Sequence, residues 1–312
     1  MPCFNEFTFP SNDGRTEIYV RECVPDGEIR GTVQIVHGVV EHSGRYEDFM
    51  RFLAENGYAV AANDHLGHGK SVASGDDRGF FCEHDGWNTV VADIRSLAEI
   101  QREKYPDVKR AVFGHSMGSF LARTYIIAHP DDFDAAVICG TGQQRAGLVA
   151  AGRMLAEHKC RKNGPRSRSR TVQKLAFAGY NRKFKPVKTG LEWLSRNEEN
   201  IIAYAQDPMC GGTVSVGLFR DMMCGIQYIS DPANIEHMRK DLPVFFIAGA
   251  LDPVGEAGAG VARAYRAFLN AGMTDVSLKL YKDDRHEILN EPDRETVYND
   301  VLSWLREKIS GV

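Results

Sequence analysis

A serine between two glycines is the feature of the sequence that most directly indicates chemistry. The stretch VFGHSMGSF, residues 112–120, places Ser116 directly after an apolar run and before a helical pattern. A G-x-S-x-G pattern arises often by chance, but between a strand and a helix it is typical of a nucleophile on a sharp turn. Gly114 and Gly118 have no Cβ, which would let the strand and the helix approach each other there. We therefore predict that Ser116 is a catalytic nucleophile.

Two residues far downstream have the types that a nucleophilic serine requires. A hydroxyl is a poor nucleophile at neutral pH unless a histidine takes its proton and a carboxylate orients that histidine. Asp252, in GALDPV, follows a strand pattern, and His286, in DDRHEILNE, follows the last one. Each alone could be an ordinary turn or surface-loop residue. The order serine, acid, histidine at three strand ends instead predicts a catalytic triad.

An acyl-transfer site also needs donors for the negative charge that develops on the carbonyl oxygen. The loop after TVQIVHG, residues 32–38, would supply the amide of Val39, and the turn after Ser116 would supply the amide of Met117. The helix that begins at Met117 adds the positive end of its dipole. We expect these two amides to form an oxyanion hole.

The elements that must carry these residues alternate between strands and helices. Apolar β-branched runs predict strands, and amphipathic patterns predict helices. The predicted strands are 4–9, 16–24, 32–38, 58–64, 111–116, 135–142, 242–252 and 276–284, and the predicted helices are 46–56, 87–104, 117–128, 261–271 and 296–309. This alternation is typical of an α/β protein with a mostly parallel sheet and helices on both faces.

The alternation stops near residue 142 and resumes with the strand at 242–252. The patterns between these points are helical and irregular, without a repeat. A helical block inserted between two strands of one sheet most simply covers the carboxyl edge of that sheet. We predict that residues 1–141 and 236–312 form the core and that residues 142–235 form a helical cap, or lid, insertion.

Composition and charge exclude several classes of protein. The chain has 312 residues, a net charge of -4 and a pI near 6.2, which argues against general nucleic-acid binding. No apolar stretch approaches the roughly 20 residues that span a bilayer, and the N-terminus lacks the pattern of a secretory signal. The seven cysteines have no C-x-x-C spacing, so we expect reduced thiols in a cytoplasmic protein.

Five strings extend the pattern over nearly the whole chain. They are HGVVEHSGRY (37–46), NDHLGHGKS (63–71), GHSMGS (114–119), LDPVG (251–255) and HEILNE (286–291). In this order they resemble the α/β-hydrolase family of monoacylglycerol lipases and lysophospholipases; EWLSR (192–196) and DPMCGG (207–212) are similar to bacterial lysophospholipases. The resemblance implies hydrolysis of carboxylic esters with one acyl chain, without a metal or an organic cofactor. It also implies Ser116, Asp252 and His286 as the triad and Val39 and Met117 as oxyanion donors.

Other polar residues near these strings have alternative roles. Glu41 and Arg45, beside the oxyanion loop, would either bind a glycerol or head group of the substrate or form an internal salt bridge that holds the loop. The run from Asp64 to His68 matches no metal-ligand spacing and is expected to form a hydrogen-bonded loop. His115, next to the nucleophile, is expected to be structural.

The predicted cap holds a concentrated positive charge. From Lys159 to Lys188 the sequence has eleven Lys or Arg residues and no Asp or Glu. These would either attract an anionic membrane surface, which predicts peripheral association, or lie on a solvated loop.

An apolar stripe at helical spacing would either pack inward or line an acyl tunnel. The stripe consists of Leu218, Phe219, Met222, Met223 and Ile226.

These features predict a serine carboxylic-ester hydrolase that acts on single-chain lipids, monoacylglycerols or lysophospholipids, through an acyl-Ser116 intermediate. The enzymatic alternatives are a peptidase or amidase and a short-chain esterase of the same fold. A peptidase usually needs an acidic pocket for the free amine of its substrate, which the basic cap disfavours. The alternatives outside enzymology are a membrane-docking module and a ligand receptor, which would be expected to lack a triad residue. No nucleic-acid partner is expected, and the oligomeric state is left open.

Overall fold

One sheet of eight strands runs through the protein, in the order β1-β2-β4-β3-β5-β6-β7-β8. The computed structural model describes residues 1–177 and 179–310, and only the backbone of residues 175 and 176. The strands are β1 (Cys3–Pro10), β2 (Glu17–Val24), β3 (Gly31–Val36), β4 (Tyr58–Asn63), β5 (Arg110–His115), β6 (Ala135–Cys139), β7 (Val244–Gly249) and β8 (Val276–Tyr281). The pairs β1–β2 and β2–β4 are antiparallel, and all other pairs are parallel. The short turn between β1 and β2 allows only antiparallel pairing, whereas parallel strands need longer crossovers.

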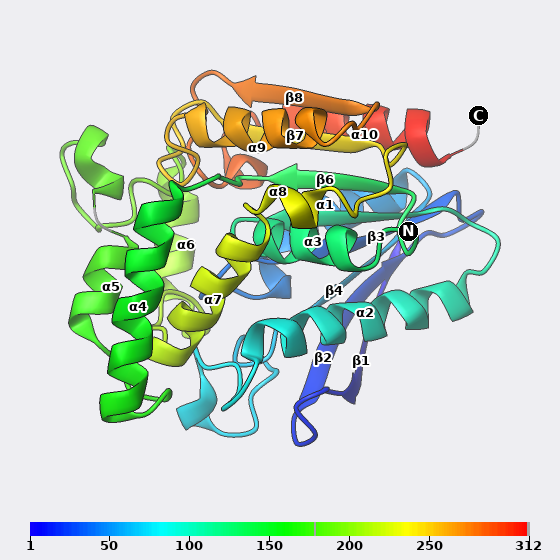
Figure 1. Ribbon diagram of the computed structural model, residues 1–312. Coiled ribbons are helices and arrows are strands. Elements are labelled where there is room, and N and C mark those ends of the chain that lie inside the picture. The colour runs from blue at the N-terminus through cyan, green and yellow to red at the C-terminus, as the bar shows by residue number, and fades with distance from the viewer. Residues whose placement is uncertain (178, 311–312) are drawn as a thin grey trace.

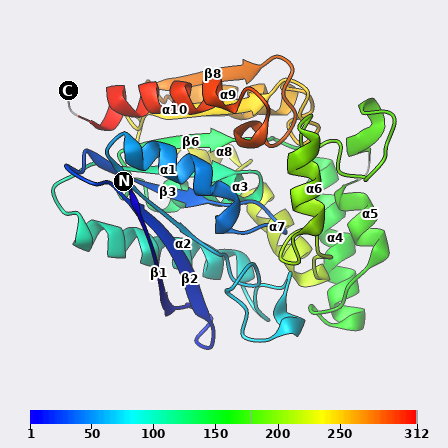
Figure 2. The same cartoon turned by 180° about the vertical axis from the view of Figure 1, so that it is seen from behind.

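Helices cover both faces of this sheet, as the sequence predicts. One face carries α1 (Glu47–Glu55) and α10 (Arg294–Ile309), and the other carries α2 (Gly86–Lys104), α3 (Met117–Ala128) and α9 (Ala259–Asn270). Figure 1 looks toward the face with α2, α3 and α9, and Figure 2 shows α1 and α10 from behind. Two apolar clusters, one on each face, bury the β-branched side chains of the central strands. Burial on both faces explains why these strands have continuous apolar sequences rather than alternating ones.

Three predicted strands extend too far at their carboxyl ends. The structure ends β6 at Cys139, β7 at Gly249 and β8 at Tyr281, whereas the sequence pattern continues for three residues beyond each. At Gly140 the backbone turns to a φ of 58°, which stops the strand. The residues after β7 and β8 turn into the loops that carry Asp252 and His286. Loops with their own apolar residues therefore mimic strands in the sequence.

Residues 142–235 connect β6 to β7, and we call them the inter-strand segment; apart from residue 178, which is not described, they contain five α-helices. They are α4 (Ala146–Asn163), α5 (Arg170–Ala176), α6 (Glu198–Gln206), α7 (Val216–Tyr228) and α8 (Pro232–Ile235). Helices α4, α5 and α6 lie beyond the carboxyl ends of the parallel strands (Figure 1). Short 3₁₀ turns complete the chain at Ser43–Tyr46, Gly75–Asp77, Tyr180–Lys183 and Ile288–Asn290.

The apolar stripe on α7 is divided between the core and a cavity. Leu218 is fully buried and belongs to the core, whereas the other four residues line a cavity described below.

The seven cysteines are free thiols within the described part of the chain. None of the helices in the described ranges combines the length and the hydropathy that a bilayer-spanning helix requires.

Candidate active site

Ser116 lies on a sharp turn between β5 and α3. Its backbone has φ 55° and ψ -122°, a conformation that few residues other than glycine adopt. A Cβ on Gly114 would overlap the carbonyl of Gly118, and a Cβ on Gly118 would overlap the carbonyl of Val36. The glycines therefore let the helix start directly against the sheet, with the serine side chain at its N-terminus.

Asp252 and His286 meet at the same edge of the sheet. Asp252 follows β7, His286 follows β8, and Asp252 Oδ2 is 2.9 Å from His286 Nδ1. The other carboxylate oxygen accepts the Val254 amide at 2.8 Å, and both Asp252 and His286 are buried. Because Nδ1–H is donated to the carboxylate, the Nε2 lone pair of the imidazole is free to accept a proton.

Ser116 and His286 line one cavity, but their side chains are not hydrogen bonded to each other in the described structure. Hydrogen bonds between nucleophile and base are often long in ligand-free enzymes and shorten when substrate binds. The structure thus brings the three predicted triad residues to one site and joins two of them directly. The catalytic role of each remains a prediction.

The two expected oxyanion donors also line this cavity. Met117 is the first residue of α3 and Val39 lies in the loop after β3, and neither amide donates to another group within the described residues. A Cβ on Gly38 would lie 3.0 Å from Ser116 Cβ, so this loop packs directly against the nucleophile. Val40, the residue after Val39, has a φ of 54°, which is rare for a β-branched side chain. The loop is therefore held in a strained conformation beside Ser116.

Glu41 is the residue that holds this loop from the core side. One oxygen, Oε1, accepts the Gly38 amide at 2.5 Å and the Tyr46 hydroxyl at 2.8 Å. Burial alone would raise the pKa of Glu41, but the hydrogen bond and charge of His115 hold it well below its usual range. Glu41 is thus a buried carboxylate whose bonds fix the position of the Gly38–Val39 backbone.

The hydrogen-bond partners of His115 determine its protonation. Tyr46 has one hydroxyl proton and donates it to Glu41, so His115 Nδ1, 2.9 Å from the Tyr46 oxygen, must itself donate. His115 Nε2 lies 3.2 Å from the carbonyl of His286 and must also donate. Burial disfavours the charge, but Glu41 outweighs burial and raises the pKa of His115. His115 is therefore a buried imidazolium that pairs with Glu41 and anchors the backbone of His286.

Arg45 forms the internal salt bridges that were one of its two expected roles. Its guanidinium is 3.6 Å from Glu41 and 2.6 Å from Glu287, and it donates to Asn200 at 2.8 Å. The side chain is 9% exposed and lies over the ring of Tyr204. A direct contact of Glu41 or Arg45 with substrate remains a prediction.

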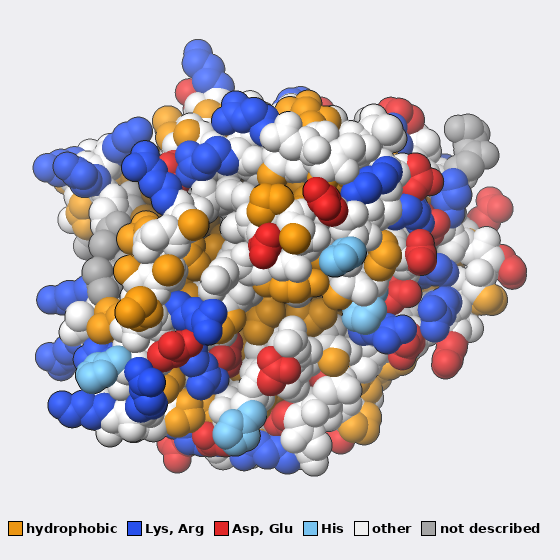
Figure 3. All heavy atoms as spheres, in the orientation of Figure 1, with side chains coloured by type: hydrophobic (Ala, Val, Ile, Leu, Met, Phe, Trp, Pro, Cys, Tyr) orange, Lys and Arg blue, Asp and Glu red, His pale blue; other side chains and the backbone are white. Residues whose placement is uncertain are grey.

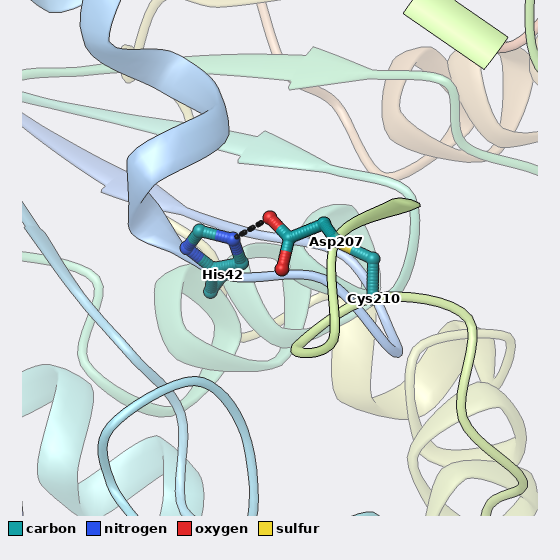
Figure 4. A group of neighbouring side chains, drawn as sticks. All are labelled: His42, Asp207 and Cys210. Carbon is teal, nitrogen blue, oxygen red and sulfur yellow. Dashed lines mark hydrogen bonds and ion pairs between the residues drawn. The ribbon is translucent and has the colours of Figure 1, made fainter. Parts of the chain in front are cut away.

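A second set of contacts ties the oxyanion loop to the inter-strand segment. His42 Nδ1 accepts the Gly44 amide, so Nε2 carries the proton and donates to Asp207 at 2.8 Å (Figure 4). Cys210 lies beside this pair, and burial raises the pKa of its thiol to about 12. Because imidazole and carboxylate satisfy each other and the thiol stays protonated, we interpret the group as a tether rather than a metal site. The amide of Gly211, the residue after Cys210, donates to the carbonyl of Val40 at 2.9 Å.

The run from Asp64 to His68 forms a loop held by its own hydrogen bonds. Asp64 accepts the amides of Ser43 and Lys70, at 2.8 and 2.7 Å. The rings of His37, His65 and His68 contact one another in tilted or edge-on pairs, and burial lowers the pKa of all three. These neutral rings pack beside the loop after β3, where His65 Nε2 lies 3.1 Å from the carbonyl of His37.

The cavity between the sheet edge and the inter-strand segment has a volume of about 520 Å³. Most of its wall is apolar and comes from α4, α7 and the aromatic residues Phe177, Tyr180 and Trp193. The lining also includes His115, His286 and three glutamates, Glu41, Glu256 and Glu287. Each glutamate already has a partner: Glu41 has His115, Glu287 has Arg45, and Glu256 has Arg263. The cavity therefore offers a largely apolar chamber whose glutamates are engaged by other side chains.

Comparison with known proteins is consistent with this geometry. A family model described as "Serine aminopeptidase, S33" matches residues 27–293. The chain belongs to this family. The monoacylglycerol lipase of Mycolicibacterium smegmatis is 28% identical over 90% of both chains, and the monoglyceride lipase of Mus musculus is 26% identical over 94% of this chain and 88% of its own.

Solved structures confirm the predicted α/β-hydrolase fold of this member of the S33 family. The crystal structure of a thermostable carboxyl esterase from Bacillus coagulans, in complex with glycerol, has a TM-score of 0.92 and 28% identity. It covers 98% of this chain and 99% of its own. The predicted architecture, a mostly parallel sheet with an inserted helical segment, is thus the fold of this carboxyl esterase.

Two features of the site were not predicted from the sequence. The charged state of His115 depends on Tyr46 and Glu41, which are distant in sequence, so no local pattern signals it. Trp193 stacks on the His286 ring from the inter-strand segment, although EWLSR was noted only as a family-like string. Long-range stacking of this kind has no periodicity by which it could be found.

Proposed function

We propose that the protein is a serine hydrolase of carboxylic esters and that it acts on monoacylglycerols. The observation that carries the proposal is that Ser116 and the His286 of the Asp252–His286 pair line the same largely apolar cavity. The monoacylglycerol lipases and the carboxyl esterase among its relatives support the same reaction class.

Acylation would begin when His286 Nε2 takes the proton of Ser116 Oγ as this oxygen attacks the ester carbonyl carbon. The resulting oxyanion would accept hydrogen bonds from the Val39 and Met117 amides. His286 would then give its proton to the oxygen of the leaving alcohol as the C–O bond breaks. The products are a free alcohol, glycerol in the proposed case, and acyl-Ser116.

Deacylation would repeat these steps with water in place of the serine hydroxyl. His286 would take a proton from water as its oxygen attacks the acyl carbon, and would return a proton to Ser116 Oγ as the acyl–serine bond breaks. The fatty acid is released and the enzyme is regenerated. Asp252 stays ionised and stabilises the imidazolium in both steps.

The cavity supports a substrate with one acyl chain. The apolar walls from α4 and α7 would bury the chain, at about 0.8 kcal/mol for each methylene group removed from water. The methionines Met222 and Met223 have flexible side chains that suit chains of different shape. We propose that the inter-strand segment acts as the cap, with residues 1–141 and 236–312 as the core.

A peptidase or amidase activity is not favoured, although the family model carries an aminopeptidase description. An aminopeptidase needs a carboxylate for the free ammonium group of its substrate. The cavity does contain glutamates, contrary to what the basic cap suggests, but Glu41, Glu256 and Glu287 are all engaged by other side chains. Comparing an aminoacyl-naphthylamide with a monoacylglycerol under the same conditions separates the two activities.

We further propose peripheral association with anionic membranes through α4 and α5. Figure 3 shows Lys and Arg side chains gathered over these helices, with hydrophobic side chains between them. Leu148 and Met154 on α4 are 67% and 68% exposed. Three of the eleven Lys and Arg residues between Lys159 and Lys188 have partners: Arg166 and Lys188 form ion pairs, and Arg168 donates to two carbonyls. The other eight side chains form no ion pair and no hydrogen bond within the described structure.

Sedimentation with vesicles tests this association. Replacing Lys159, Arg161 and Lys162 by Glu is expected to abolish binding to vesicles containing phosphatidylserine, because each cation near such a surface contributes about 1 kcal/mol. The control replaces two exposed residues in the same way, Arg102 in the last turn of α2 and Lys109 just before β5, since neither belongs to α4 or α5. Equal loss in both variants, or equal binding to neutral vesicles, would contradict the proposal.

The substrate class is tested with a panel of monoacylglycerols, lysophospholipids and short-chain p-nitrophenyl esters, using Ser116→Ala as the blank. We expect the highest kcat/KM for monoacylglycerols and lower values for short esters, because short chains leave much of the apolar cavity unfilled. Hydrolysis of short esters alone would identify a general esterase, and no hydrolysis of any ester would overturn the proposal.

A further inference from the structure

Two other rings lie close to the imidazole of His286. On the core side the ring of His115 has its centroid 4.8 Å away, at an angle of 41°. On the side of the inter-strand segment the ring of Trp193 is 5.0 Å away, at 37°. Trp193 is buried and lines the same cavity as Ser116. The proposed catalytic base thus has one cationic ring and one neutral aromatic ring close to it.

The core side works against a positive charge on His286. His115 is an imidazolium by its proton count, and a second cation at this distance is destabilised by Coulomb repulsion. Glu41 neutralises part of that charge, and Asp252 supplies the opposite charge in the plane of the ring. The remaining groups that approach the site, Glu287 and Tyr180, lie in the cavity wall.

The Trp193 side works in the opposite direction. The face of an aromatic ring attracts a cation within about 6 Å of its centroid, and tryptophan has the strongest such attraction. His286 is neutral before the reaction and becomes a cation only while it holds the serine or water proton. An interaction that exists mainly with the charged form lowers the barrier rather than tightening substrate binding.

Hydrogen bonds fix the indole relative to the imidazole. The Trp193 amide donates to Asn181 at 2.9 Å, and the carbonyl of Leu194 accepts the Glu287 amide at 2.7 Å. One residue further on, the Ser195 hydroxyl donates to Glu291 at 2.9 Å. The backbone that carries Trp193 is therefore bonded directly to the loop that carries His286.

We propose that Trp193 is a positioning residue that supports the charged form of His286 during proton transfer. The inference rests on the proposed hydrolase function and deepens it, because it assigns to the inter-strand segment a part in the chemistry. It also separates Trp193 from the rest of the aromatic wall, whose rings contact the acyl chamber but not the base.

The test compares Trp193→Leu, Trp193→Phe and Phe177→Leu with p-nitrophenyl acetate and with a long-chain p-nitrophenyl ester. Trp193→Leu is expected to lower kcat roughly tenfold, with KM changed less than about twofold, equally for both esters. Trp193→Phe keeps a flat ring and is expected to recover most of this loss. Phe177 contacts Trp193 but not His286, so the loss in Phe177→Leu should grow with chain length. Thermal unfolding of each variant separates folding defects from catalytic ones.

The outcomes distinguish this proposal from the one on which it rests. A loss in Trp193→Leu that appears in KM and grows with chain length would show that the indole is only a wall for the acyl chain. A Trp193→Phe enzyme no more active than Trp193→Leu would also overturn the proposal. If the leucine variant does not fold, a Trp193→Phe enzyme whose loss appears in KM and grows with chain length would overturn it instead. A wild-type protein without activity on either ester would instead refute the hydrolase function.

Discussion

At the scale of single residues, the site depends on a few buried charges whose bonds are already complete. Glu41 accepts the Gly38 amide and the Tyr46 hydroxyl and faces His115. The Val39 amide follows directly in the chain, so its direction depends on the carboxylate of Glu41. This arrangement favours the loop-holding role of Glu41 over a direct role in binding a head group.

Glu41→Gln is therefore expected to impair catalysis rather than binding. The amide side chain cannot accept from every donor that the carboxylate serves, so the oxyanion loop loses its fixed position. Loss of one oxyanion donor typically lowers kcat about 100-fold, and we expect a decrease of that order with little change in KM. Steady-state kinetics on a monoacylglycerol measure both constants.

The control for this change is Glu256→Gln, since Glu256 lines the same cavity but pairs with Arg263. It should alter kcat far less than Glu41→Gln does. If Glu41→Gln instead raised KM and left kcat intact, Glu41 would be a substrate-binding residue and not the support of the loop.

At the scale of elements, helix α7 joins the inter-strand segment to the core, and this contact buries the carboxylate of Asp221. Asp221, on the buried side of α7, is 5% exposed, and Arg220 is its ion-pair partner at 2.7 Å. Burial outweighs the attraction of Arg220 and raises the pKa of Asp221 to about 6. In the unfolded chain an aspartate has a pKa of about 3.9.

This shift predicts how stability changes with pH. Between pH 4 and pH 6 the folded protein holds more protons on Asp221 than the unfolded chain, so its contribution to stability falls as pH rises. Asp221→Asn removes this contribution. The free energy of unfolding of the variant, relative to wild type, should therefore increase by at most about 3 kcal/mol from pH 4 to pH 7. Urea unfolding at several pH values measures it, and a difference that is constant or falls with pH would contradict the assignment.

The elements also show what the sequence could and could not predict. Helix α3 matches its predicted bounds of 117–128, because its apolar face and the turn at Ser116 mark both ends. Strand ends are less certain, since the loops after β6, β7 and β8 contain apolar residues that continue the strand pattern. The triad is predictable because each member follows a strand, and parallel strands share one carboxyl edge. The stacking of Trp193 on His286 is not, because it depends on the path of the inter-strand segment.

At the scale of the whole molecule, both ends of the inter-strand segment are attached to the helix behind the nucleophile. Arg123 of α3 is fully buried and donates to the carbonyl of Gly142 at 3.0 Å and to that of Ile229 at 3.1 Å. Burial lowers the pKa of its guanidinium to about 9. One side chain thus links the start and the end of this segment to the element that begins at Ser116. Together with the His42–Asp207 tether, it fixes the segment over the strand ends.

Covalent labelling by a fluorophosphonate, with the modified residue mapped by mass spectrometry, tests the central claim most directly. The reagent forms a bond only with a serine whose proton is removed by a base. We predict one adduct, on Ser116, in the wild-type protein, much slower labelling in His286→Ala, and none in Ser116→Ala. No adduct in the folded wild-type protein, or an adduct on another residue, would contradict the account.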